Sequence, residues 1–186
     1  PSKEIDKTES PTSLYGASKK SNELMAYSYS NLFNINTIGL RFFTVYGPWG
    51  RPDMALFLFT KNMIENKKID VYNNGNHSRS FTYIDDIVES IARLYNKIAD
   101  KDQAGSYKIF NIGGENSVEL MKYIKAIEDE LKVKAKLNFL PKQPGDVIKS
   151  ESDSSALENF ISFRPETSIK YGIKNFIDWY RDYYNF

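Results

Sequence analysis

Residues 15–43 decide the fold and read YGASKKSNELMAYSYSNLFNINTIGLRFF. In the first part of this stretch, apolar and aromatic side chains recur at i, i+4, i+7 and i+8 from Met25, which predicts an amphipathic helix over residues 15–33. After a short connection, Thr37–Phe43 is dense in β-branched and aromatic side chains, as is typical of a strand buried in an α/β sheet. The stretch therefore predicts a chain in which helices and strands alternate.

The rest of the sequence continues this alternation. Runs of β-branched and aromatic residues predict strands at Ile69–Tyr72, Phe81–Tyr83, Tyr107–Ile112 and Ala135–Leu140. Apolar residues at helical spacing and capping signals predict helices over 54–66, 86–98, 120–131, 154–159 and 169–184. Asp85 is the predicted N-cap of the helix over 86–98, and Asn116 with Glu119 forms a predicted capping box before Leu120. Residues 1–14 and 44–53 are predicted loops.

The composition excludes several classes of function. The 186 residues carry 25 basic and 24 acidic side chains, so no field of a single sign is available to hold nucleic acid or an anionic membrane. Without cysteine, disulfides, thiolate metal sites and cysteine nucleophiles are excluded. No apolar run approaches the roughly 18 residues of a membrane span. The start at Pro1 resembles no signal or transit peptide, so we expect a soluble, cytoplasmic protein.

Tyr15 and Lys19 are the first candidates for chemistry. Four residues apart, they lie on the same face of a helix. A phenol with an ordinary pKa of about 10 is a poor base at neutral pH, and a neighbouring ammonium favours its ionised form. One exposed pair supplies less than the roughly 4 kcal/mol required, so a second positive charge, such as an oxidised nicotinamide ring, is the natural supplement. Taken alone, the pattern also fits an ordinary first-turn tyrosine beside an exposed lysine.

Other motifs occur in a fixed order around this pair. They read PTSLYGASK at 11–19, LRFFTVYGP at 40–48, RSFTYIDD at 79–86 and QPGDV at 143–147. Together they resemble the extended short-chain dehydrogenase/reductase family and, within it, the NAD-dependent nucleotide-sugar epimerases. Residues 43–57, FTVYGPWGRPDMALF, resemble the UDP-glucuronate 4-epimerases most closely. The similarity runs from about Thr8 to the last predicted helix.

The resemblance implies an α/β fold, namely the C-terminal portion of an extended short-chain dehydrogenase/reductase. Residues 1–52 would be the closing segments of an NAD-binding Rossmann domain, and residues 53–186 would form mainly a small α/β domain that binds the UDP-sugar. Family members hold NAD on a Gly-rich βα turn, and no GxGxxG occurs here. The catalytic Ser or Thr of the family would also lie upstream of Pro1. We therefore expect the C-terminal part of an enzyme, inactive on its own.

The activity implied by the resemblance is the inversion of C4 of UDP-glucuronate to UDP-galacturonate through a 4-keto sugar, in polysaccharide precursor synthesis. Tyr15 would take the proton of the 4-hydroxyl group while NAD accepts the hydride. Lys19 would bind the nicotinamide ribose and favour the phenolate. Phe42 and Val45 belong to the segment that passes the cofactor, so Tyr15, Lys19, Phe42 and Val45 are the predicted cofactor-binding residues.

The sugar and the uracil have candidates of their own. Thr44 would hydrogen-bond the sugar carboxylate, and Arg51 would serve that carboxylate or the diphosphate. Asp70, Val71 and Tyr72 match the segment around uracil, where backbone groups read the base edge and an aromatic ring packs on its face. Considered without the resemblance, Thr44 is equally a strand-end hydroxyl bonded to backbone, and Arg51 is a solvated loop charge.

The diphosphate and the ribose complete the implied site. Arg79 would clamp the diphosphate, although Ser80 follows it where related sequences often carry Asp. Asp146 would take the ribose hydroxyls, in a loop where Gln143 stands near the place of an arginine in galactose-type relatives. His77 is interpreted as an exposed turn histidine rather than as a phosphate contact.

The partners and alternatives follow from the same reasoning. We expect a homodimer through the helix that carries Tyr15, no nucleic acid or membrane partner, and no metal site. The acidic residues Asp85 and Asp86 are interpreted as helix capping rather than as a metal site or an acid/base pair. Other readings stay open: a UDP-galactose 4-epimerase, a UDP-glucuronate decarboxylase, or a non-catalytic module that binds a UDP-sugar.

Overall fold

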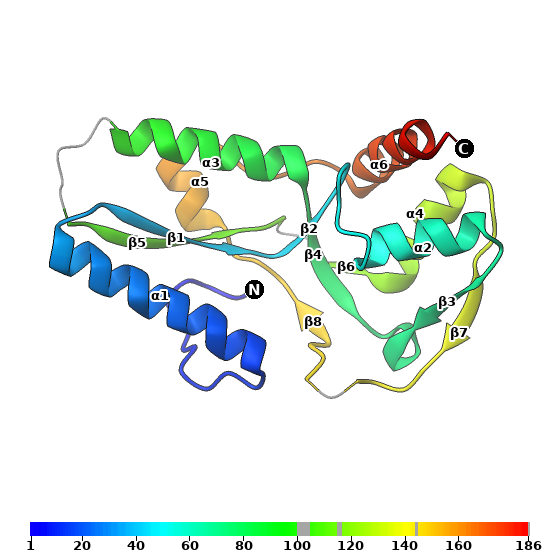
Figure 1. The fold of residues 1–186 in the computed structure, drawn as a ribbon, viewed down its shortest axis with the longest axis horizontal. Helices are drawn as coiled ribbons and strands as arrows, with labels where there is room; N and C mark the ends of the chain where they lie inside the picture. The colour runs from blue at the N-terminus through cyan, green and yellow to red at the C-terminus, as the bar shows by residue number, and fades with distance from the viewer. Residues whose placement is uncertain (100–104, 115–116, 144, 186) are drawn as a thin grey trace.

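Helices and strands alternate along the chain, which confirms the predicted α/β class. The computed structural model describes residues 1–99, 105–114, 117–143 and 145–185 (Figure 1). The elements follow in the order α1 (Leu14–Phe33), β1 (Thr37–Phe42), β2 (Thr44–Tyr46), α2 (Ala55–Ile64), β3 (Lys68–Val71), the 3-10 turn η1 (Tyr72–Gly75), β4 (Ser78–Tyr83), α3 (Ile84–Ala99), β5 (Tyr107–Ile112), β6 (Ser117–Glu119), α4 (Leu120–Leu131), β7 (Lys136–Phe139), β8 (Lys149–Ser150), α5 (Ser155–Ile161) and α6 (Ile169–Tyr184).

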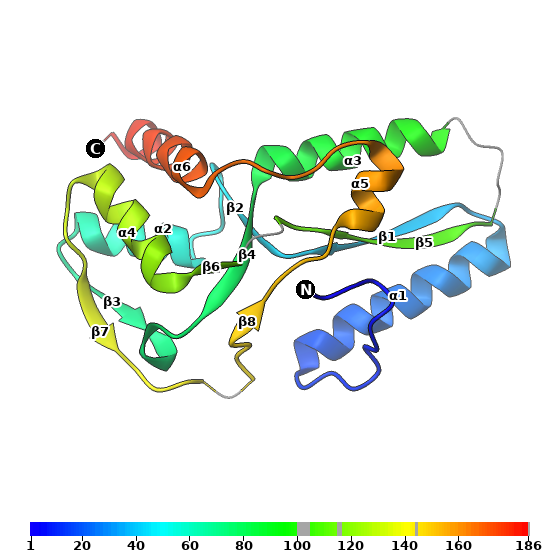
Figure 2. The same ribbon diagram turned by 180° about the vertical axis from the view of Figure 1, so that it is seen from behind.

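The first part of the molecule is built on the parallel pair β1 and β5, in register from Thr37 opposite Tyr107 to Phe42 opposite Ile112. Helix α1 lies on one side of this pair, and α5 and α3 lie on the other (Figures 1 and 2). Its core is a cluster of buried apolar side chains contributed by α3, β5 and α5: Ile87, Leu94, Phe110, Ile112, Leu157 and Ile161. Removing each such side chain from water contributes about 1.5–3 kcal/mol.

The second part contains the parallel pair β3 and β7 together with the sheet in which β4 pairs with β2, β6 and β8. Helices α2, α4 and α6 enclose the second core, in which the ring of Phe81 stacks on that of Tyr123 at a centroid distance of 3.9 Å. The chain passes from the first part to the second through β2, which follows β1 directly. The two cores are interleaved along the chain, because α3, β5 and α5, which come later in the sequence, pack with β1 in the first core.

Helix α1 begins where its sequence provides a cap. The Ser13 side chain accepts a hydrogen bond from the Gly16 N–H at 3.0 Å, which satisfies one of the free N–H groups of the first turn. The helix ends at Asn34, whose φ of 55° is left-handed, a conformation that asparagine tolerates. This cap fixes Tyr15 in the first turn.

The structure corrects two predicted boundaries near the site. Thr44–Tyr46 forms strand β2 rather than a loop, because it pairs in parallel with Phe81–Tyr83 of β4. Strand β4 begins at Ser78 rather than at Phe81, because its first residues pair with both β6 and β8. Pairing between segments distant in sequence therefore outweighs the local Gly and Pro signals.

Two predicted helix caps are also wrong. Ser117–Glu119 forms β6, so Glu119 ends a strand and stands directly before α4. Its carboxylate makes no capping hydrogen bond and pairs with Lys122. Asn116, the other half of the predicted capping box, lies outside the described residues. Helix α3 already begins at Ile84, so Asp85 lies in the first turn and is not the N-cap.

Helix α6 packs closely on β2 at Gly172. A Cβ added there would lie 2.3 Å from the Tyr46 hydroxyl oxygen and 2.6 Å from its ring carbon Cε2. Overpacking costs about 1–3 kcal/mol, and an approach of 2.3 Å to a buried ring belongs at the upper end of that range. Because the better helix propensity of alanine returns about 1 kcal/mol, we expect Gly172→Ala to lower the free energy of unfolding by about 2 kcal/mol. Chemical denaturation measures this, with Lys170→Ala on the exposed face of α6 as the control. Unchanged stability in Gly172→Ala would contradict the close packing.

Candidate functional site

A cavity of about 530 Å³ lies in the second part, between α2, β3 and β4. It collects most of the predicted substrate residues on one surface: Thr44, Asp70, Tyr72, Arg79 and Asp146. Apolar side chains supply much of the remaining wall, among them Met54, Leu58, Phe81, Val118 and Leu120. An apolar cavity with a few convergent polar groups is typical of a small-molecule site.

Arg79 is the cation of this cavity, and its guanidinium is held in place. Nη1 donates to the carbonyl oxygens of Ser78 at 3.0 Å and Ile148 at 3.1 Å, and Nη2 lies 3.5 Å from Oδ1 of Asp146. Burial lowers the pKa of Arg79, against the effect of the Asp146 carboxylate, yet a guanidinium stays charged at neutral pH. The buried Ser80 hydroxyl instead accepts from the Ser152 N–H, so Ser80 does not orient the guanidinium.

His77 lies inside this cavity wall, and its interpretation as an exposed turn histidine is wrong. The residue is 9% exposed, because its N–H donates to Gly75 and its carbonyl accepts from Leu120, which tie it between η1 and α4. Nε2 lies 3.3 Å from Oδ2 of Asp146. His77 directly precedes β4, whose first residues pair with β6 and β8, and the local sequence carries no signal of this pairing.

The segment predicted for uracil reaches the cavity with two of its side chains. Asp70 and Tyr72 line the cavity, and Oδ1 of Asp70 accepts a hydrogen bond from Asn138 at 2.7 Å. The side chain of Val71 is fully buried in the second core, and its carbonyl accepts from the Leu140 N–H at 3.0 Å. Val71 therefore presents no side chain to the cavity.

Arg51 lines a smaller neighbouring cavity of about 40 Å³ that also includes Thr44. Its guanidinium is exposed and pairs with Asp53, at 3.0 Å from Nε to Oδ1 and 2.5 Å from Nη2 to Oδ2. This hydrogen-bonded pair raises the pKa of Arg51, and Tyr15 adds to the effect. Arg51 is therefore paired with Asp53 at the surface and does not line the larger cavity.

Tyr15 and Lys19 share one face of α1, as predicted. Lys19 Nζ lies 5.3 Å from the centroid of the Tyr15 ring, and the ring is 71% exposed. Phe42, at the end of β1, is also exposed, whereas Val45 packs against the first core. None of these four residues lines the larger cavity. Tyr15, Lys19 and Phe42 are exposed, whereas Val45 is partly buried and borders only the smaller cavity.

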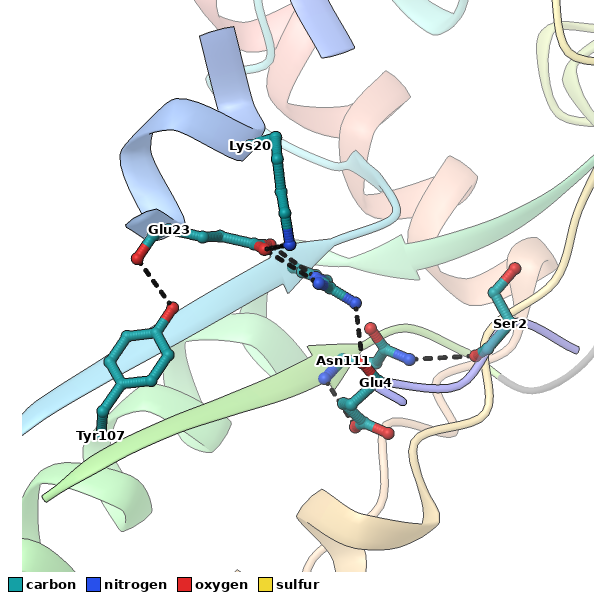
Figure 3. A network of polar contacts seen from close by, with 7 residues as sticks. Ser2, Glu4, Lys20, Glu23, Tyr107 and Asn111 are labelled. Carbon is teal, nitrogen blue, oxygen red and sulfur yellow. Dashed lines mark hydrogen bonds and ion pairs between the residues drawn. The ribbon is translucent and has the colours of Figure 1, made fainter. Parts of the chain in front are cut away.

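An ion-pair network holds α1 against β1 (Figure 3). Glu23, one turn after Lys19, binds the guanidinium of Arg41 with both carboxylate oxygens, at 2.6 Å to Nε and 2.9 Å to Nη2. Lys20 Nζ adds a contact of 3.1 Å to the same carboxylate, and the Tyr107 hydroxyl donates to the Glu23 carbonyl. This bidentate pair orients the face of the helix that carries Tyr15.

The same pair predicts a pH dependence of stability. The hydrogen bond from Arg41 lowers the pKa of Glu23 below its ordinary value of 4.5. The pair therefore contributes its full stability above that value and loses it as pH falls through the lowered pKa. We expect Glu23→Gln to cost about 1.5–3 kcal/mol at pH 7, and the difference from the unmodified protein to shrink in acid.

Denaturation at pH 7 and at pH values below the ordinary pKa of the carboxyl group measures this difference. The control is Glu89→Gln, which removes an ion pair with Arg93 whose side chains are both about half exposed. That pair is worth at most about 1 kcal/mol. A loss for Glu23→Gln as small as that of the control would mean that the network does not hold α1.

The part of the chain that the structure describes contains no helix with the length and the apolar composition of a membrane span. No three His, Asp or Glu side chains in it come together in a group that could hold a metal ion. The candidate site consists of the cavity lined by Arg79 and Asp146 and, outside its wall, the exposed pair Tyr15 and Lys19 on α1.

Comparisons with known proteins give the context of this site. The family model described as "NAD dependent epimerase/dehydratase family" matches residues 1–113. Protein CapI from Staphylococcus aureus is 51% identical, over 96% of this chain and 57% of its own length. A probable UDP-glucuronate 4-epimerase from Rhizobium meliloti is 42% identical, over 99% of this chain and 58% of its own length.

Solved structures agree with these matches. The UDP-glucuronic acid 4-epimerase from Bacillus cereus, in complex with UDP-glucuronic acid and NAD, superposes with a TM-score of 0.86 at 32% identity. The superposition covers 94% of this chain and 55% of that structure. The chain thus spans a little over half the length of the relatives that it matches.

Proposed function

Because this chain belongs to the NAD dependent epimerase/dehydratase family, we propose that it is the C-terminal part of a UDP-glucuronate 4-epimerase that uses NAD. The observation that carries the proposal is the single cavity in which Thr44, Asp70, Tyr72, Arg79 and Asp146 lie together. Similarity to the Bacillus cereus epimerase supports the substrate class. In this proposal, the full-length protein is this chain preceded by an N-terminal half that would hold most of the NAD.

The cavity has the groups that a UDP moiety requires. The guanidinium of Arg79 suits a diphosphate, because it is a planar donor fork with a permanent charge. Asp146 faces it and would accept hydrogen bonds from the ribose hydroxyls. The Tyr72 ring and Asp70 would border the uracil, with Val71 taking part only through its backbone, since its side chain is in the core.

The sugar would extend from this cavity toward the smaller one. Thr44 lines both cavities, so its hydroxyl stands where a sugar attached to the diphosphate would pass. Arg51 would bind the sugar carboxylate by exchanging its present partner, Asp53, for the substrate. Both of these residues are exposed, so the exchange breaks no buried ion pair.

Tyr15 and Lys19 fit the cofactor side of the site. They are exposed together at the start of α1, and α1 begins toward the carboxyl end of β1 (Figure 1). Ligands of α/β sheets bind outside the carboxyl ends of the strands. Tyr15 would take the proton of the sugar 4-hydroxyl as general base. Lys19 would hold the nicotinamide ribose and stabilise the phenolate. NAD, when bound, supplies the hydride chemistry at C4, and Phe42 and Val45 would shape the surface beneath it.

The sheet leaves room for a further half. Within the described part of the chain, β1 pairs with β5 along one edge and with no strand along the other, so the sheet can continue there. Helix α1 also exposes Leu24, Met25, Leu32 and Phe33. We include in the proposal that this face joins a second copy in a homodimer, in a cytoplasmic enzyme of polysaccharide precursor synthesis.

The proposal is tested by following the product of the full-length protein. Incubated with UDP-glucuronate and NAD, it should form UDP-galacturonate and release no CO2, which NMR of the reaction mixture measures. Formation of UDP-xylose with release of CO2 would overturn the 4-epimerase assignment in favour of a decarboxylase.

A second candidate function is a non-catalytic module that binds a UDP-sugar. It is favoured by one observation: among the described residues, the wall of the larger cavity does not include Tyr15. Calorimetric titration of the full-length protein with UDP and NAD separately distinguishes the two functions. Binding of UDP without binding of NAD would support the module.

A further inference from the structure

His77 is a buried polar side chain in the cavity wall to which the proposed function gives no role. Its Nε2 atom is buried and, among the described residues, has no hydrogen-bond partner. Oδ2 of Asp146 lies 3.3 Å from this nitrogen. A buried donor without a partner is unfavourable, so the Asp146 carboxylate is the group that a small rotation would bring into a hydrogen bond with it.

Two side chains, His77 just before β4 and Arg79 within it, each approach one oxygen of the Asp146 carboxylate. Oδ2 faces His77 Nε2, and Oδ1 faces Arg79 Nη2 at 3.5 Å. Asp146 itself lies on the segment between β7 and β8, where a carboxylate without side-chain contacts would sample several rotamers. Arg79, in contrast, lies in β4, where it pairs with β6 and β8, and His77 directly precedes that strand and is held by backbone hydrogen bonds to Gly75 and Leu120. Both can therefore fix the orientation of a loop residue.

The charge state of His77 suits this task. Burial lowers the pKa of His77, the Asp146 carboxylate opposes that effect, and Arg79 and Lys142 lower the pKa further. The imidazole is therefore neutral at pH 7 and carries one N–H. That proton belongs on Nε2, because an unprotonated nitrogen there would direct its lone pair at a carboxylate. A neutral donor positions Asp146 without cancelling its negative charge.

We propose that His77 is a positioning residue that fixes the Asp146 carboxylate for the ribose hydroxyls of a nucleoside diphosphate. The inference rests on the proposed function, which places the ribose at Asp146. It adds that the cavity distinguishes a ribonucleotide from its 2′-deoxy analogue, because only an oriented carboxylate can accept from the 2′-hydroxyl as well as from the 3′-hydroxyl.

Calorimetry on the full-length protein with UDP and 2′-deoxy-UDP tests the inference. In His77→Phe, which keeps a planar ring but has no donor, UDP affinity should fall about tenfold, or about 1.4 kcal/mol. The affinity for 2′-deoxy-UDP should fall much less. His77→Gln, whose amide can donate to the same carboxylate, should stay within about threefold of the unmodified protein. His77→Met provides the same comparison should the Phe variant fail to fold.

The outcomes separate the inference from the proposed function. In an Asp146→Asn background, His77→Phe should add no further loss, because the two residues act as one unit. Equal losses for both nucleotides, an unchanged UDP affinity in His77→Phe, or no preference for UDP in the unmodified protein would each overturn the role of His77. Failure of the unmodified protein to bind UDP at all would instead overturn the proposed function, and the inference with it.

Discussion

Replacing Tyr15 by Phe in the full-length protein is expected to lower kcat for UDP-glucuronate about 10²–10⁴-fold, the range that a positioned general base contributes. The variant loses only the hydroxyl, and the ring stays available to the Lys19 ammonium 5.3 Å away. UDP affinity should be unchanged, because Tyr15 does not line the cavity that would hold the nucleotide. Initial rates and calorimetric titration with UDP measure the two quantities.

Tyr29→Phe is the matched control for this experiment. Tyr29 is also an exposed tyrosine of α1, and its ring packs against Phe33 at a centroid distance of 5.1 Å, a contact that Phe preserves. The kcat of Tyr29→Phe should stay within about twofold of that of the unmodified protein, since this substitution removes no group assigned to the chemistry. Near-normal turnover in Tyr15→Phe would exclude Tyr15 as the base and return the exposed pair to an ordinary helix surface.

Removing the guanidinium of Arg79 is expected to give the second large effect. Arg79→Ala should weaken UDP binding by about 1.5–3 kcal/mol, or roughly 10- to 150-fold in Kd, as for a lost charge-assisted contact. The UDP affinity of Arg79→Lys should lie between those of the unmodified protein and of Arg79→Ala, because lysine keeps the charge and loses the planar fork. Calorimetry of the full-length protein with UDP measures both variants.

Two checks separate a binding role of Arg79 from a structural one. Arg79 also donates to the carbonyl of Ile148, so the variants are compared by thermal denaturation before binding is interpreted. Arg93→Ala, an exposed arginine on α3 paired with Glu89, should leave UDP affinity unchanged. An Arg79→Ala protein that is folded and binds UDP as tightly as the unmodified protein would remove Arg79 from the site.

The elements whose signals are local could be predicted from the sequence. Helix α1 and strand β1 were predicted within one residue at either end, because the helical spacing from Met25 and the dense run from Thr37 lie inside the elements themselves. The shared face of Tyr15 and Lys19 follows from that helix. The gathering of Arg79 and Asp146 could be expected only from the resemblance, since they are far apart in the chain.

The features that depend on distant pairing could not be predicted. Strand β2 forms from a Gly- and Pro-flanked segment because β4 lies beside it. His77 is buried because Ser78, the residue after it, starts a strand that pairs with both Glu119 and Lys149. The turn-like sequence around His77 contains neither Glu119 nor Lys149. The functional consequence is that a histidine interpreted as a surface residue belongs to the wall of the candidate site.

The central claim is that the full-length protein inverts C4 by removing a hydride from that carbon and returning it there, with Tyr15 handling only the hydroxyl proton. UDP-glucuronate that carries deuterium at C4 tests this most directly when it is incubated with the full-length protein and NAD in ordinary water. We expect UDP-galacturonate that keeps its deuterium at C4, as measured by NMR and mass spectrometry. Loss of the C4 deuterium to water during conversion, or a folded protein that binds both ligands and forms no epimer, would contradict the account.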